Sequence, residues 1–211
     1  MSHDLLTLVQ WLSPAFPTGG FAYSHGLESA ISAGQVTDAA ALRQWLTEVL
    51  HFGAGRQDAI LLVQALGPEA DHSALDDLAR ALQPSSERLS ETLEQGTAFA
   101  RTVAALTGRA LPARCLPVAV GEAATPLSLP PAQVAALYLH AFASNLTSVA
   151  MRFMPLGQEA GQGVLAALHP VIDALATEAT RLTLDDLGSS ALGADLSALA
   201  HETLDVRIFR T

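Results

Sequence analysis

The chain has 211 residues, 50% hydrophobic and only 5% aromatic, a composition that suits one sizeable core and favours helix over strand. Its formal net charge is −10, which argues against a nucleic-acid binder because no basic stripe is present to displace counterions. All eleven basic residues are arginines, and the absence of lysine excludes a P-loop nucleotidase and Schiff-base chemistry.

The sequence carries no sign of export or of a membrane span. Cys115 is the only cysteine, so neither an intramolecular disulfide nor a Cys-x-x-Cys site can form, and a reducing compartment is indicated. No basic segment precedes the first apolar run, which stops at Pro14. The longest apolar stretch, 134–151, contains His140 and Asn145. We therefore expect a soluble, cytoplasmic protein with no membrane partner.

The first informative segment is 14–28, which follows the apolar run 5–12. Pro14 and Pro17 remove two backbone donors, so the segment cannot continue that run as a regular helix. Gly19-Gly20 allows a positive φ or a close backbone approach. We expect a packed turn that presents backbone and aromatic groups, with Ser24 capping a helix whose first turn is 25–28.

Helical periodicity continues along nearly all of the remaining chain. The expected helices or apolar stretches cover 42–50 after a Thr37-Asp38 start signal, 60–66, 71–82, 86–106 with Gly108 as a stop, 131–153, and 161–182 with a bend at Pro170. The segment 118–120 could be helix or a buried run. These elements predict a single all-α domain over residues 1–211 with roughly eight to ten helices.

The expected helix 131–153 carries polar groups at the end of its apolar stripe. Asn145, Ser148 and Arg152 continue that stripe at helical spacing. An unpaired buried arginine would cost about 3–5 kcal/mol. Either this end of the stripe reaches a subunit interface, or Arg152 meets an internal carboxylate, for which Glu28 and Glu202 are the candidates.

Two further segments suggest ligand sites only weakly. Glycines at 157, 161 and 163 could indicate a phosphate loop, but a helix precedes them where a dinucleotide fingerprint needs a strand, so a turn between helices is favoured. His201-Glu202 lacks the second histidine of a zincin motif, and the other histidines show no metal-binding spacing. The tail 206–211 is apolar enough to dock on the body or on a partner.

No pattern assembles an active site, so the residues alone indicate a binding protein. The competing class is a hydrolase that would use His25 and Glu28, one helical turn apart.

Three segments, in order along the chain, are similar to the UreF family of urease accessory proteins. They are Pro17–Glu28, Ser144–Gln158 and His201–Thr211, with a lesser match at Gln95–Phe99. The resemblance implies an all-α, homodimerising, non-enzymatic protein that bridges the scaffold UreD (also called UreH) and the GTPase UreG. The implied complex inserts nickel into apo-urease and couples delivery to GTP hydrolysis, and this chain holds no stably bound cofactor. A free nickel-storage protein is a third alternative.

The resemblance also suggests roles for particular residues. The turn would shape a surface for the GTPase or a route for the metal, through Gly19, Gly20, Phe21, Tyr23 and Glu28. The neighbouring face would be organised by Asn145, Arg152 and Gln158. The segment 201–211 would be a partner-docking tail, ordered against the scaffold from Val206 onward, with His201, Glu202, Arg207, Phe209 and Arg210.

Overall fold

The computed structural model describes residues 3–211, and every regular element in that part of the chain is helical. The predicted all-α class is therefore confirmed; residues 1 and 2 of the expected domain lie outside the described residues. The elements are α1 (His3–Trp11), η1 (Gly20–Ala22), α2 (Leu27–Ser32), α3 (Ala39–Phe52), α4 (Ala54–Ala65), α5 (His72–Ala81), α6 (Ser86–Thr107), α7 (Leu116–Ala124), α8 (Pro131–Phe153), α9 (Gln158–Ala179), η2 (Leu184–Asp186) and α10 (Leu192–His201).

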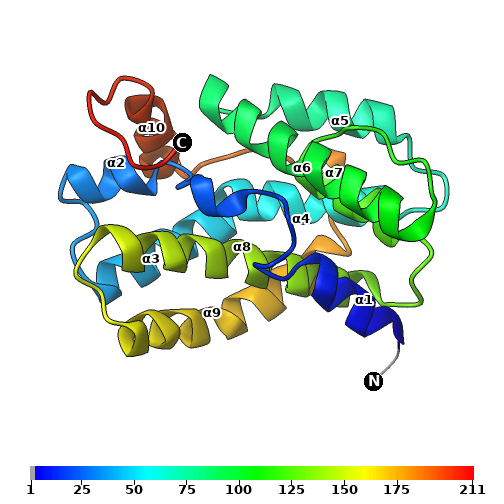
Figure 1. Ribbon diagram of the computed structural model, residues 1–211, viewed down its shortest axis with the longest axis horizontal. Coiled ribbons are helices and arrows are strands. Elements are labelled where there is room, and N and C mark those ends of the chain that lie inside the picture. Colours follow the sequence, from blue (N-terminus) through cyan, green and yellow to red (C-terminus); the bar gives the residue numbers. More distant parts are fainter. Residues whose placement is uncertain (1–2) are drawn as a thin grey trace.

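The longest helices form the centre of the molecule. α8 and α9 run antiparallel beside each other, joined by a turn at 154–157, and α3 packs against α9 (Figure 1). α4 contacts α7, α8 and α9, while α6 lies along α7. The short helices α10 and α2 pack together near the carboxyl terminus, at the end of the molecule away from α1 (Figure 1).

The core consists mainly of leucine, valine and alanine side chains from these helices. The predicted stripe of α3 is buried along its whole length, at Leu42, Trp45, Leu46, Val49 and Leu50. Burying one such side chain contributes about 1.5–3 kcal/mol. A smaller cluster joins α4, α5 and α7 around Leu61, Leu75 and Val118.

Several predicted boundaries are confirmed by their capping groups. Asp38 accepts a hydrogen bond from the backbone N–H of Ala41 at 2.8 Å and so caps α3. Gly108, with φ 72°, ends α6 in the left-handed conformation. The segment around 118–120 is helix, and α9 runs through Pro170 without interruption.

The start of α2 differs from the prediction. His25 has φ 60° and Gly26 has φ 79°, and two consecutive left-handed residues cannot join a right-handed helix. α2 therefore begins at Leu27 rather than at His25. The Ser24 hydroxyl still accepts from the backbone N–H of Glu28, at 3.3 Å.

α8 is long and apolar enough to cross a membrane by length and composition alone. Half of its most apolar window is buried inside the protein, and α8 packs against α9, α4 and α2. These contacts make it a central core helix.

Candidate functional site

The proline-glycine turn covers a cavity between α6 and α8. Gly19 takes φ 78°, and η1 follows directly. Asn145 of α8 donates to the carbonyl of Gly20 at 3.0 Å, which fixes the turn on that helix. A Cβ added at Gly20 would lie 3.1 Å from Oε1 of Gln95, on α6. Gly20 thus lets the backbone approach the rim of the cavity closely.

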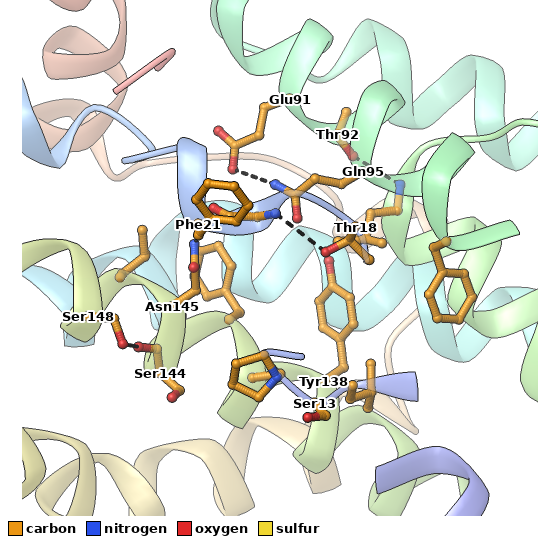
Figure 2. A pocket seen from close by; sticks show the side chains of 18 of the residues that line it. Ser13, Thr18, Phe21, Glu91, Thr92, Gln95, Tyr138, Ser144, Asn145 and Ser148 are labelled. Atoms are coloured by element: carbon orange, nitrogen blue, oxygen red, sulfur yellow. Dashed lines mark hydrogen bonds between the residues drawn. The ribbon is translucent and has the colours of Figure 1, made fainter. Parts of the chain in front are cut away.

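The cavity has a volume of about 350 Å³. In Figure 2, Glu91, Thr92 and Gln95 enter it from α6, and Tyr138, Ser144 and Asn145 line it from α8. Its apolar wall includes Trp11, Leu12, Phe99, Leu116, Ala141, Phe142 and Leu146. The later part of the predicted α8 stripe, from Tyr138 to Phe142, and its polar continuation therefore border one cavity; the continuation is Asn145, Ser148 and Arg152.

Buried charged groups line this cavity as well. Asp58 of α4 accepts from the Tyr138 hydroxyl at 2.7 Å, and burial raises the pKa of Asp58 to about 6. Arg88 forms a buried ion pair with Glu91. Burial acts to raise the pKa of Glu91, but Arg88 and His25 outweigh it and lower that pKa to about 2. The walls thus hold two carboxyl groups with opposite pKa shifts.

His25 borders this charged cluster. Its Nδ1 is buried without a hydrogen-bond partner, 3.8 Å from Oε1 of Glu91. Burial and the charge of Arg88 lower the pKa of His25. Its ring meets Phe142 edge-on at 5.0 Å. Glu28 instead accepts hydrogen bonds from backbone N–H groups of the carboxyl-terminal tail, so the hydrolase hypothesis lacks the His25–Glu28 pair that it requires.

Glu28 holds the carboxyl-terminal tail on the body. This side chain is only 1% exposed. It accepts hydrogen bonds from the backbone N–H groups of Ile208 at 2.7 Å and Phe209 at 2.9 Å, and lies 3.2 Å from Nε2 of His201. The tail was predicted to dock either on the body or on a partner. Within this single chain it docks on the body.

Further contacts tie down the end of the tail. The N–H of Arg210 donates to the carbonyl of Ala22 at 2.8 Å, and the N–H of Ser24 donates to the carbonyl of Thr211 at 3.0 Å. The Thr211 hydroxyl donates to Glu91 at 2.8 Å. The tail therefore connects the turn with the charged groups of the cavity.

A hydrogen-bonded cluster lies over this junction, formed by Tyr23, Glu94 and Arg210. The Tyr23 hydroxyl donates to Glu94 at 2.5 Å, and the Arg210 guanidinium donates to both carboxylate oxygens of Glu94, at 2.5 and 2.8 Å. Burial and the Glu94 carboxylate raise the pKa of Tyr23. Because Glu94 and Arg210 are solvent-exposed, this ion pair contributes only about 0–1 kcal/mol.

Arg152 meets neither Glu28 nor Glu202, so the alternative of an internal carboxylate was wrong, while the alternative of a subunit interface stays a prediction. Its Nη2 donates to the carbonyl of Phe21 at 2.7 Å, and its guanidinium lies 4.7 Å from the ring centroid of Phe209. The side chain is exposed, so no buried charge needs neutralising. Arg152 joins the turn to the tail through a carbonyl and an aromatic face.

Glu202 and His201 belong to the supporting structure. Glu202 accepts from the N–H groups of Ser86 at 2.8 Å and Glu87 at 3.2 Å, so its charge stabilises the amino-terminal end of α6. His201 is fully buried, with Nδ1 2.7 Å from Glu87, which also pairs with Arg207.

The structure gathers most, but not all, of the predicted site residues. The turn, Asn145, Arg152 and the tail form one continuous junction, whereas Gln158 is exposed at the start of α9 and joins none of these contacts. Sequence reasoning missed Asp58, Arg88 and Glu91. The signal for the last two was an Arg-x-x-Glu pair on the helix face that also carries Gln95 and Phe99.

The described residues form a small all-helical protein with a cavity below the turn and a tail docked on the body. A family model described as UreF matches residues 36–169. A protein named urease accessory protein UreF, from Cereibacter sphaeroides, is 66% identical over 211 residues, covering 100% of both chains. Proteins of the same name from Paracoccus denitrificans and Roseobacter denitrificans are 55% and 47% identical, covering 98% and 100% of this chain and 95% and 96% of their own. The chain belongs to the UreF family.

Proposed function

We propose that this chain is a urease accessory protein and not an enzyme. It bridges the UreD/UreH scaffold and the UreG GTPase, acts as a homodimer in the cytoplasm, and supports insertion of nickel into apo-urease. In this proposal nickel is cargo handled by the assembled complex, and the chain regulates GTP hydrolysis by UreG without binding nucleotide itself. Family membership and the name of the relatives support the urease role.

One observation supports the bridging role most directly. The three segments that resemble the family form one composite surface, held by Arg152 between the Phe21 carbonyl and the Phe209 ring. This surface leaves Phe21 70% exposed and Ile208 71% exposed. Large apolar side chains presented beside fixed charges are typical of protein contact sites.

We assign the exposed side chains of the turn and those of the tail to different partners. Phe21 lies on the turn at the cavity rim and serves the GTPase, where the cavity provides a route for the metal. Ile208 and Val206 lie on the outer side of the tail and serve the scaffold. Neither side chain supports the core, so each can be changed without removing a buried contact.

The test uses Phe21→Asp and Ile208→Asp, with Leu106→Asp as the matched control. Leu106 is also exposed but lies at the far end of α6. The variants are co-purified with scaffold, GTPase and apo-urease, and urease activity is measured after incubation with nickel and GTP. We expect Phe21→Asp to lose the GTPase, Ile208→Asp to lose the scaffold, and the control to retain both and full activation. Normal assembly and activation by both test variants would refute the proposal.

A further inference from the structure

Two histidines face each other on the outer side of the α8–α9 pair. The rings of His140, on α8, and His169, on α9, have centroids 5.5 Å apart and planes inclined by 41°. His140 is half-buried and His169 is exposed. They are 29 positions apart in sequence, so only the antiparallel packing of α8 on α9 brings them together.

The ring nitrogens of this pair have no assigned use in the described chain. His201 and His72 place ring nitrogens on protein oxygens, at 2.7 and 2.9 Å. By contrast, no hydrogen bond or ion pair found among residues 3–211 involves the ring of His140 or His169. The partner of each ring is the other ring.

The pair is separate from the cavity. Neither His140 nor His169 is among the residues that line the cavity. Any role of this pair is therefore distinct from that of the turn and the tail.

We infer that His140 and His169 form a two-histidine site for a late divalent transition metal ion, with Ni²⁺ as a suitable ligand. Imidazole nitrogen is a preferred ligand of Ni²⁺, Cu²⁺ and Zn²⁺. Rings at this separation can direct one nitrogen each toward a shared ion at about 2.0–2.1 Å after small side-chain rotations.

The surroundings of His140 favour the metal-binding form of its ring. A ring binds metal only when the coordinating nitrogen carries no proton. Burial and the facing His169 both lower the pKa of His140, which favours the neutral imidazole that can bind a metal ion. Asp173 follows His169 by one helical turn on the exposed side of α9 and adds negative charge nearby.

The number of ligands indicates a site that exchanges its metal. No group of three or more His, Cys, Asp or Glu able to hold a metal occurs in the part of the chain that the structure describes. Two imidazoles leave the remaining coordination positions to water, so the ion is held loosely. The expected order of affinity is Cu²⁺ above Ni²⁺.

The test is a calorimetric titration of the full chain with Ni²⁺ at pH 7.5. We expect one saturable site per chain, weakened at least tenfold in His140→Ala and in His169→Ala. His3→Ala and His51→Ala are the controls, because they remove single histidines outside the pair and should leave the site intact. Unchanged binding in His169→Ala, or loss of the site in His3→Ala alone, would overturn the inference.

A second measurement locates the ion and covers any folding defect of the half-buried His140 variant. Paramagnetic Ni²⁺ should broaden the NMR signals of His140, His169 and Asp173 before those of His51. Broadening centred elsewhere contradicts the assignment.

Discussion

The tail should undock from the body more readily when the Glu28 carboxylate is removed. Glu28→Ala deletes the acceptor of the Ile208 and Phe209 backbone N–H groups. A hydrogen bond to a charged group contributes about 1.5–3 kcal/mol. Two such bonds at the lower value favour docking by about 3 kcal/mol, which corresponds to more than a hundredfold in the docking equilibrium.

Hydrogen exchange of the Arg210 amide measures this equilibrium, because its acceptor, the Ala22 carbonyl, is kept in the variant and protection of a locally opening segment follows its opening free energy. We expect this amide to exchange about a hundredfold faster in Glu28→Ala, while the helical circular dichroism is retained. Glu48→Ala, an exposed glutamate of α3, is the matched control. Wild-type exchange at the Arg210 amide in a folded Glu28→Ala protein would refute the reasoning. If Glu28→Ala fails to fold, Phe209→Ala tests the same docking through its lost burial.

Four other outcomes are expected. Gly96→Ala would place a Cβ 2.0 Å from the carbonyl oxygen of Arg114, so it should destabilise the protein by about 1–3 kcal/mol. Gly163→Ala meets nothing within 4 Å and should stabilise α9 by up to about 1 kcal/mol; equal melting temperatures for the two variants would contradict this packing. Because the folded-state pKa of Asp58, about 6, exceeds its ordinary 3.8, the folded state binds this proton more tightly than the unfolded state does. When the pH is lowered from 7 to 5, the unfolding free energy of the wild type should therefore rise by about 1.4 kcal/mol relative to that of Asp58→Asn, as measured by urea titration. A difference between the two proteins that does not change with pH would refute the raised pKa of Asp58. Cys115 is buried with its pKa raised to about 12 by burial, so maleimide should label it only after unfolding, and rapid native labelling would show that the thiol is accessible.

The fold could be predicted from sequence because its signals are local. The apolar spacing of α3 and the Asp38 cap lie within one segment, as do the long amphipathic pattern of α6 and its Gly108 stop. Each depends on residues three or four positions apart. The start of α2 was misplaced because the left-handed conformation of His25, a non-glycine residue, is set by its tertiary surroundings.

The site was predictable as a set of segments but not as a set of contacts. The bonds from Glu28 to the tail span 180 and 181 positions, and nothing in the local pattern selects that carboxylate over Glu202. Because its helix position suggested burial, Arg152 was expected either to reach a subunit interface or to meet an internal carboxylate. Its exposed side chain instead donates a hydrogen bond to the Phe21 carbonyl and lies over the Phe209 ring.

The docked tail changes how a partner would recognise this surface. Phe209 and Thr211 point inward, while Ile208 and Arg210 point outward, the alternation of an extended segment. The N–H groups of residues 208–210 are already bonded within the protomer, so a partner cannot recruit them for strand pairing and must contact the outward side chains. Fixing a backbone costs about 1–2 kcal/mol per residue, so a tail of six residues docked in advance spares a partner about 6–12 kcal/mol of ordering. The prediction that the tail becomes ordered against the scaffold implies the opposite starting state, in which residues 206–211 are free in the isolated chain. Exchange protection of the Ile208 and Phe209 amides in the absence of any partner therefore distinguishes recognition of a pre-formed surface from folding on binding.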